Sequence, residues 1–207
     1  MERPIRVGIV GSRFAAEFHY TAYQRVTGID VKVVGVTSLT KEHREDFAKK
    51  REIRAFNSLE EMLSEIDVID VCTPGYAHEE VSITALEAGK HIVVEKPFTG
   101  YFGPSGDKNF KGNVFPKEKM LEEAIASARR IIAAALKNKK KICYAENWIY
   151  APSIQKEAEI ITKTKGQILW ALGDQSHSGS LSPAYGIWRL SGGGSIVGKS
   201  CHPLSAI

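Results

Sequence analysis

Residues Gly11 to Ala16 (Gly-Ser-Arg-Phe-Ala-Ala) follow an apolar run and precede a helical pattern, which is where a glycine-rich turn can bind a pyrophosphate. Only the first glycine of the G-x-G-x-x-G/A pattern is present, because Arg13 holds the second position and Ala16 the third. A helix N-terminus at this turn would still offer free N–H groups, and the guanidinium of Arg13 could reach a phosphate. The alternative is a strand-to-helix turn that binds nothing.

The end of the second apolar run indicates which dinucleotide this turn would bind. An acidic residue that could hold the ribose hydroxyls of NAD is absent there, since the run ends Gly-Val-Thr37-Ser38-Leu-Thr-Lys41. The hydroxyls of Thr37 and Ser38, with Lys41 and Arg44 nearby, suit the 2′-phosphate of NADP better than a free diol. We therefore favour NADP over NAD, the alternative being hydroxyls that only cap the next helix.

Two further segments place polar groups directly after predicted strands. Cys72-Thr73-Pro74-Gly75 makes a turn, and a helix begins at about His78. That helix ends at Gly89-Lys90-His91, before an apolar run that leads into Glu95-Lys96-Pro97. Because the carboxyl ends of parallel strands meet at one edge of a sheet, we expect a bound dinucleotide to lie near Gly11, Ser38, Thr73 and Lys96.

The elements that must position these residues alternate between short β-branched runs and longer segments of helical period, which is typical of βαβ units. The predicted strands are Ile5 to Val10, Val31 to Val36, Asp67 to Cys72, His91 to Val94 and Lys141 to Ala145. The predicted helices are Phe14 to Val26, Lys41 to Lys50, Leu59 to Glu65, His78 to Ala88 and Lys117 to Asn138. Asp70 falls inside the third strand, where its burial would require a hydrogen-bonding partner.

Two stretches depart from this alternation. The segment Gly100 to Pro116 carries four Gly and two Pro, so we predict a long connection without regular structure that is either functional or mobile. After Tyr150 the pattern changes to a helix at Ser153 to Thr162, a strand at Gln167 to Leu172 and a Gly/Ser-rich stretch. This change indicates the start of a second domain.

The motifs, in their order along the chain, resemble those of the Gfo/Idh/MocA family of NAD(P)-dependent oxidoreductases. The segments that carry the resemblance are the Gly11 turn, Cys72-Thr73-Pro74, Gly89-Lys90-His91, Glu95-Lys96-Pro97, Glu146 to Pro152, and Trp188 to Gly194 with His202. The resemblance thus extends over most of the chain, although the segment from residue 100 to 116 is longer than the family leads us to expect.

This resemblance implies an α/β fold, with a Rossmann-like doubly wound parallel sheet in residues 1–150. Residues 151–207 would begin an incomplete α+β domain for substrate binding and oligomer contacts, so a homo-oligomer is possible. We expect this domain to be truncated, because the chain stops at Ile207 inside an apolar, helical segment with no C-cap signal.

In the family the lysine of the Glu-Lys-Pro motif lies beside substrate and nicotinamide, which implies catalytic and substrate-binding roles for Lys96. Removing a hydride from a carbinol carbon requires a group that accepts the hydroxyl proton or stabilises the oxyanion, and a partly desolvated lysine can do so. A solvated lysine at a strand end is the alternative. The family also suggests a cis bond before Pro97, where trans is the ordinary expectation. The implied cofactor-binding residues are Gly11, Arg13, Phe14, Ala15, Thr37, Ser38, Thr73, Pro74, His78, Glu95 and Lys96.

The second catalytic position of the family is a histidine that follows an aspartate by four residues. His202 matches the histidine, but Gly198 stands in the aspartate's place, so a purely structural histidine is the alternative. Asn147 and His177 are further candidates for substrate contact, and helix entry is an equal alternative for Asn147. His78 could instead cap or pack its helix.

Composition narrows the possible classes of partner. The formal net charge of +4 is too small to indicate nucleic acid, and no apolar run is long enough to span a membrane. The three cysteines, Cys72, Cys143 and Cys201, are widely spaced, so we predict reduced, largely buried thiols and no metal site. With no leader-like segment at the start, we expect a cytoplasmic protein.

The first hypothesis for function is an NAD(P)-dependent oxidoreductase that transfers a hydride between a nicotinamide and a sugar, polyol or related carbinol. One alternative is a dinucleotide-binding remnant without turnover, favoured by Arg13, Gly198 and the early end at Ile207. Another is a relative that uses transient oxidation to cleave glycosidic bonds.

Overall fold

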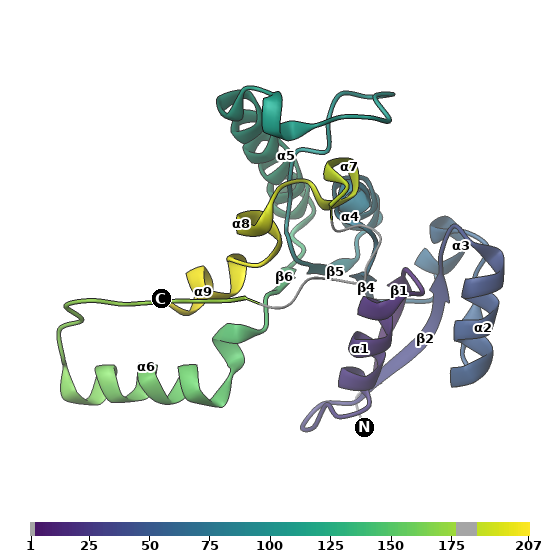
Figure 1. The fold of residues 1–207 in the computed structure, drawn as a ribbon. Coiled ribbons are helices and arrows are strands. Elements are labelled where there is room, and N and C mark those ends of the chain that lie inside the picture. Colours follow the sequence, from purple (N-terminus) through teal and green to yellow (C-terminus); the bar gives the residue numbers. More distant parts are fainter. Residues whose placement is uncertain (1–2, 177–185) are drawn as a thin grey trace.

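A six-stranded, fully parallel sheet organises the chain in the computed structural model, which describes residues 3–176 and 186–207 (Figure 1). The strands are β1 (Ile5–Val10), β2 (Val31–Thr37), β3 (Arg54–Ala55), β4 (Val68–Val71), β5 (His91–Glu95) and β6 (Ile142–Ala145). Their order is β3-β2-β1-β4-β5-β6, so the direction of winding reverses between β1 and β4. In doubly wound sheets, ligands bind outside the carboxyl ends of the strands at this reversal.

Helices connect the strands and cover both faces of the sheet. They are α1 (Phe14–Tyr23), α2 (Lys41–Arg51), α3 (Leu59–Leu63), α4 (His78–Glu87), α5 (Lys117–Asn138), α6 (Pro152–Thr164), α7 (Trp188–Ser191), α8 (Ser195–Gly198) and α9 (Cys201–Ala206). Short 3₁₀ turns are η1 (Gly75–Ala77), η2 (Gly112–Val114) and η3 (Trp148–Tyr150). None of the helices in the described residues is long and apolar enough to cross a bilayer.

Two apolar clusters fill the spaces between the sheet and its helices. Ile9 packs with α1 and α2 on one face, whereas the next residue, Val10, packs with α3, α4 and α5 on the other. This alternation follows from the two-residue period of a strand. Each fully buried aliphatic side chain, such as Ile92 on β5, stabilises the fold by about 2 kcal/mol.

The predicted strands and helices of residues 1–150 are confirmed, with boundaries that differ by a few residues. The long helix has the predicted bounds, Lys117–Asn138, because its apolar face recurs at helical spacing over its whole length. The first helix ends at Tyr23 instead of Val26. Strand β3 was missed, because two residues are too few to show a periodic pattern.

The prediction of a strand at Gln167 to Leu172 is wrong. These residues have no regular structure, and Leu169 and Trp170 are 88% and 76% exposed. A strand needs a neighbour for its backbone hydrogen bonds, and no described segment pairs with this one. Residues 151–207 therefore show α6 to α9 and irregular chain, without the strands expected of an α+β domain among the described residues.

The long connection at residues 100–116 contains only the turn η2 and is held by aromatic packing. The rings of Tyr101, Phe110 and Phe115 lie 5.3 to 5.4 Å apart, and the indole of Trp188 donates to the carbonyl of Tyr101 at 3.0 Å. Gly112 lies under the Trp188 ring, where a Cβ atom would come within 2.1 Å of it. This loop and α7 thus form one packed unit over the carboxyl edge of the sheet.

The cysteines are unpaired, and their burial differs from the prediction in one case. Cys72 is buried and Cys201 half-buried, but Cys143 is exposed. Cys143 lies on β6, the edge strand of the sheet, and an edge strand with one open face exposes alternate side chains.

Candidate functional site

An open cleft of about 1850 Å³ lies along the carboxyl ends of β1, β2, β4 and β5. The predicted cofactor-binding residues line it, with His78 as the single exception: Gly11, Arg13, Phe14, Ala15, Thr37, Ser38, Thr73, Pro74, Glu95 and Lys96. The loop of residues 100–116 and α7 contribute the facing wall, including Lys108, Lys111 and Trp188. Residues from distant parts of the sequence thus converge at the reversal of the sheet.

Gly11 forms the floor of the cleft, where only glycine fits. Its φ of +119° is unfavourable for a side chain, and a Cβ atom would lie 2.5 Å from the carbonyl oxygen of Cys72. The turn is fixed from the other side by the Gly11 N–H, which donates to the Thr37 carbonyl at 2.8 Å. The backbone therefore passes close beside β2 and β4 and leaves a concave surface open to a ligand.

Helix α1 begins at this turn with its first N–H groups uncapped by any side chain. Arg13 takes the N-cap position without a side-chain capping bond, and it is exposed in the cleft. Ala16, the third member of the glycine pattern, is fully buried against the sheet, as close helix–strand packing requires. An anionic group at this N-terminus would meet both the helix dipole and the guanidinium of Arg13.

The end of β2 is tied to the Gly11 turn by side chains. The hydroxyls of Ser12 and Ser38 lie 2.9 Å apart. Arg44 is buried but lines the cleft, and its guanidinium donates to the Ser38 carbonyl at 2.9 Å and to Asn57 Oδ1 at 3.3 Å. Lys41 does not line the cleft and pairs instead with Glu45 on its own helix. Of the two cations predicted near Ser38, the structure brings only Arg44 to the site.

The turn after β4 offers an unpaired hydroxyl to the cleft. The side-chain oxygen of Thr73 is buried and has no hydrogen-bond partner in the described part of the chain. A buried polar atom without a partner is costly, and a bound ligand would remove that cost. Together with the Gly11 floor, this oxygen fits a dinucleotide.

His78 lies behind the cleft. Its ring nitrogens are 3.0 Å from the carbonyl oxygens of Thr73 and Pro97, and its side chain is 1% exposed. Burial lowers the pKa of His78, and this outweighs the hydrogen bonds to these carbonyls, which would raise it. His78 therefore links the two turns that carry Thr73 and Lys96 without lining the site itself.

Lys96 projects into the cleft from the end of β5. Its amine lies 3.5 Å from the Gly198 carbonyl oxygen, and its backbone N–H donates to its neighbour Glu95 at 2.8 Å. The bond between Lys96 and Pro97 is cis, as the family resemblance suggested. The lysine thus lies where the end of β5 meets α8.

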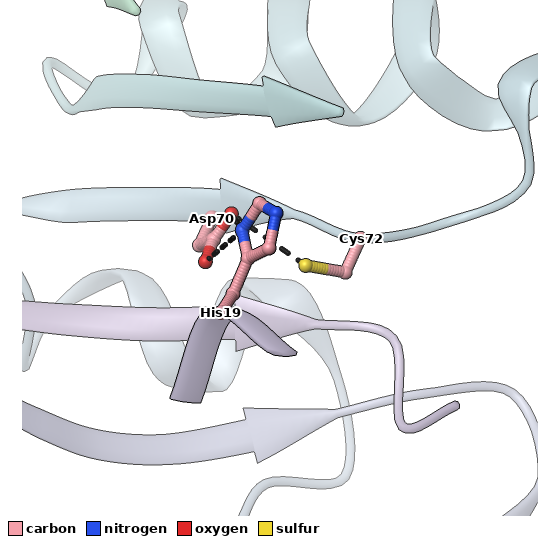
Figure 2. Close-up of side chains that lie close together, drawn as sticks. All are labelled: His19, Asp70 and Cys72. Atoms are coloured by element: carbon pink, nitrogen blue, oxygen red, sulfur yellow. Dashed lines mark hydrogen bonds and ion pairs between the residues drawn. The ribbon is translucent and has the colours of Figure 1, made fainter. Parts of the chain in front are cut away.

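A cluster of polar side chains that the sequence analysis missed contacts Glu95, the residue before Lys96. Figure 2 shows His19 of α1 pointing between Asp70 and Cys72 of the β4 strand and its end. Nδ1 of His19 lies 2.9 Å from both carboxylate oxygens of Asp70, and Nε2 lies 3.2 Å from Glu95. The only sequence signal was Asp70 inside a buried strand, which required a partner somewhere.

Burial alone would lower the pKa of His19, but hydrogen bonds to Asp70, Cys72 and Glu95 raise it well above its ordinary value. Burial, reinforced by the charge of Asp70, raises the pKa of the Cys72 thiol to about 12. One ligand atom from each of His19, Asp70 and Cys72 lies within 4.8 Å of the others, a spacing that a metal ion could bridge. The thiol is held protonated, however, and hydrogen bonds already account for the arrangement.

Two of the remaining predicted residues, His202 and Asn147, are not among the residues that line the cleft. His202 is buried, pairs through Nδ1 with Glu146 and stacks on Trp148, with ring centroids 5.6 Å apart. Glu146, which follows β6, was not singled out from the sequence as a site residue. Asn147 is exposed at the start of η3 and does not line the cleft. His177 lies outside the described residues.

A doubly wound parallel sheet with a glycine floor at its reversal defines a Rossmann-type nucleotide-binding domain. Residues 5–102 match the model of the oxidoreductase family with an NAD-binding Rossmann fold, GFO_IDH_MocA. The nucleotide-binding part of the chain, residues 5–102, is therefore similar to the Gfo/Idh/MocA oxidoreductase family.

Curated relatives include sugar dehydrogenases. The chain is 32% identical over 95 residues to UDP-N-acetylglucosamine 3-dehydrogenase of Acidithiobacillus ferrooxidans, covering 46% of this chain and 29% of the relative. It is 30% identical over 145 residues to levoglucosan dehydrogenase of Pseudarthrobacter phenanthrenivorans, covering 65% and 36%. The chain thus spans well under half the length of these relatives.

Solved structures share the fold. GenD2 from gentamicin A biosynthesis, in complex with NAD, matches all of this chain and 53% of its own with a TM-score of 0.76 at 20% identity. KijD10, a 3-ketoreductase of Actinomadura kijaniata in complex with NADP, matches 78% of this chain and 44% of its own with a TM-score of 0.59 at 20% identity.

Proposed function

We propose that this chain carries the catalytic half-site of an NAD(P)-dependent oxidoreductase that transfers a hydride between a nicotinamide and a carbinol of a sugar, polyol or related molecule. The observation that carries the proposal is the position of Lys96 in the same cleft as Gly11 and Thr73. The sugar dehydrogenases among the relatives support this substrate class.

In this proposal the Gly11 turn, Thr73 and the start of α1 hold the dinucleotide. Gly11 allows close approach, the uncapped N–H groups of α1 and the guanidinium of Arg13 face the pyrophosphate, and the Thr73 hydroxyl gains its missing partner. When bound, the nicotinamide supplies the acceptor or donor for hydride.

The amine of Lys96 binds the substrate oxygen at which charge changes. During oxidation it stabilises the oxyanion that forms as the hydroxyl proton leaves, and during reduction it stabilises the carbonyl oxygen as it gains negative charge. The Gly198 carbonyl accepts from the Lys96 amine, and the side-chain carboxylate of Glu95 accepts from the Lys96 backbone N–H, so the lysine is held at this end of the cleft. The loop of residues 100–116 and α7 form the opposite wall of the cleft.

We favour NADP as the dinucleotide. Ser38 and Arg44 line the cleft beyond β2, and no carboxylate follows that strand directly. A hydroxyl and a guanidinium suit a phosphate better than the ribose diol. The domain division at residue 150, a cytoplasmic location and a homo-oligomeric state stay predictions from the sequence.

The test is a change in the absorbance of the reduced nicotinamide when the chain is mixed with either dinucleotide and a panel of sugars and polyols. Binding with net reduction supports the proposal. Binding without any turnover would identify a remnant, and cofactor-dependent cleavage of a glycoside without net reduction would identify transient oxidation instead.

A further inference from the structure

Glu146 is a buried carboxylate that follows directly on β6. It is 2% exposed, and its two oxygens accept the N–H groups of Trp148 at 3.1 Å and Ile149 at 3.4 Å. The same carboxylate pairs with Nδ1 of His202, which lies 56 residues further along the chain. Burial would raise the pKa of Glu146, but these three hydrogen bonds, and the positive charge of His202 when its ring is protonated, lower it below its usual range.

The partner imidazole is fixed in both position and plane. His202 is 9% exposed, and its ring stacks on the indole of Trp148 with 21° between the planes. Because an ionised carboxylate only accepts hydrogen bonds, Nδ1 must donate to Glu146 and therefore carries the proton. In the neutral ring, the lone pair is then on Nε2. Within residues 3–176 and 186–207, Nε2 has no hydrogen-bond partner.

This pair is connected to Lys96 through helices α8 and α9, behind the residues that line the cleft. Helix α8, whose Gly198 carbonyl contacts the Lys96 amine, leads into α9, which carries His202. Between them lies Cys201, whose thiol pKa is raised by burial, lowered by the charge of Lys96 and raised by the charge of Glu146. The imidazole and the lysine therefore belong to one region, although they come from residues far apart in the sequence.

We propose that Glu146 is a positioning residue for His202, and that it supplies from the end of β6 the carboxylate partner absent at Gly198. The inference rests on the proposed oxidoreductase function. During oxidation Nε2 of His202 takes the hydroxyl proton of the carbinol, the C–H hydride passes to the nicotinamide, and the carbinol becomes a carbonyl. Glu146 keeps its own charge and stabilises the imidazolium that forms.

Glu146→Gln is the direct test, because it removes the charge while keeping the size and one acceptor oxygen. Glu146→Asp keeps the charge and serves as the conservative variant. Glu157→Gln, on the exposed side of α6, is a matched control. Each variant is made in the full chain, and circular dichroism verifies its folding.

The first readout is the tautomer of His202, taken from the ¹⁵N shifts of its ring without cofactor or substrate. The native chain and Glu157→Gln should show the Nδ1–H form, and Glu146→Gln should show a mixture close to that of free histidine. Glu146→Asp should retain the Nδ1–H form. An unchanged tautomer in Glu146→Gln would overturn the inference, even if the variant lost stability.

The second readout is the dependence of kcat on pH. In Glu146→Gln, kcat should fall by about tenfold or more and the acidic limb of the profile should move about one unit lower, with KM for the dinucleotide unchanged. Tyr144, Cys201, Lys96 and Lys199 are titratable residues near the pair, and all four are unaltered in this variant. Equal profiles for Glu146→Gln and the native chain would contradict the inference. If the tautomer responds but no variant turns over, the proposed function fails and the pairing stands.

Discussion

Replacing His19 by alanine should destabilise the fold, because it removes the only cation that contacts the Asp70 carboxylate in the described residues. Asp70 is fully buried in the middle of the sheet, and the side chain of His19 is 16% exposed. Removing one member of a buried ion pair costs about 3 to 5 kcal/mol, because the other charge stays without compensation. We expect about 3 kcal/mol here, the lower end of that range, since the His19 side chain is 16% exposed and water can enter the space that the imidazole leaves.

The loss should depend on pH in a defined direction. Hydrogen bonds to Asp70, Cys72 and Glu95 raise the pKa of His19 above its unfolded value of 6.5, although burial opposes them. A raised pKa contributes stability that is complete below about pH 6.5 and is lost as pH rises toward the folded value. The difference between native and His19→Ala chains should thus shrink between pH 7 and 9, by up to about 1.4 kcal/mol per pH unit.

Urea unfolding of four chains measures both effects: the native chain, His19→Ala, Asp70→Asn and the double variant. Because the pair is coupled, His19→Ala should cost at least about 1.5 kcal/mol less in the Asp70→Asn background than in the native one. Additivity within about 0.5 kcal/mol, or a destabilisation that is constant from pH 6 to 9, would refute the buried ion pair.

Three further predictions concern the cleft and the edge of the sheet. Lys96→Ala should lower turnover by about a hundredfold or more while the dinucleotide Kd stays within a few-fold, and retained activity would contradict the role of the lysine. Ser38→Asp should weaken NADP by about tenfold through charge repulsion and favour NAD, so an unchanged ratio of Kd values would show that the 2′-phosphate binds elsewhere. Hydrogen bonds from Arg3 and Arg6 hold the pKa of Asp67 far below its usual range, so this carboxylate contributes stability above about pH 4 that is lost as pH falls. In Asp67→Asn, the free energy of unfolding should therefore fall less steeply between pH 4 and lower pH than in the native chain. An equally steep fall in both chains would exclude the contribution.

The nucleotide-binding domain was predictable because its information is local. Apolar runs between Ile5 and Glu95 and the helical period of α5 depend on which residues neighbour each other in the sequence, and burial on both faces of a parallel sheet leaves a strong pattern. The prediction of a strand at residues 167–172 was wrong because a strand also depends on a partner that is not local in the sequence. The apolar residues of this segment suit a strand, but a strand exists only with a hydrogen-bonded neighbour, which the described residues do not supply.

The sequence by itself determined the chemistry available at the cleft. Gly11, Thr73 and Lys96 each follow a strand, and parallel strands bring their carboxyl ends to one edge, so their proximity follows from the order of elements alone. Their supporting carboxylates and imidazoles could not be found in this way.

Only the tertiary structure decided those pairings. His19 meets Asp70 and Glu95 across two elements, and Glu146 meets His202 across 56 residues, because helix packing sets which side chains face each other. Buried charges require partners, but that requirement does not say where along the chain a partner stands. The sequence showed Gly198 where a carboxylate was expected; the fold brings Glu146 to the histidine from the end of β6.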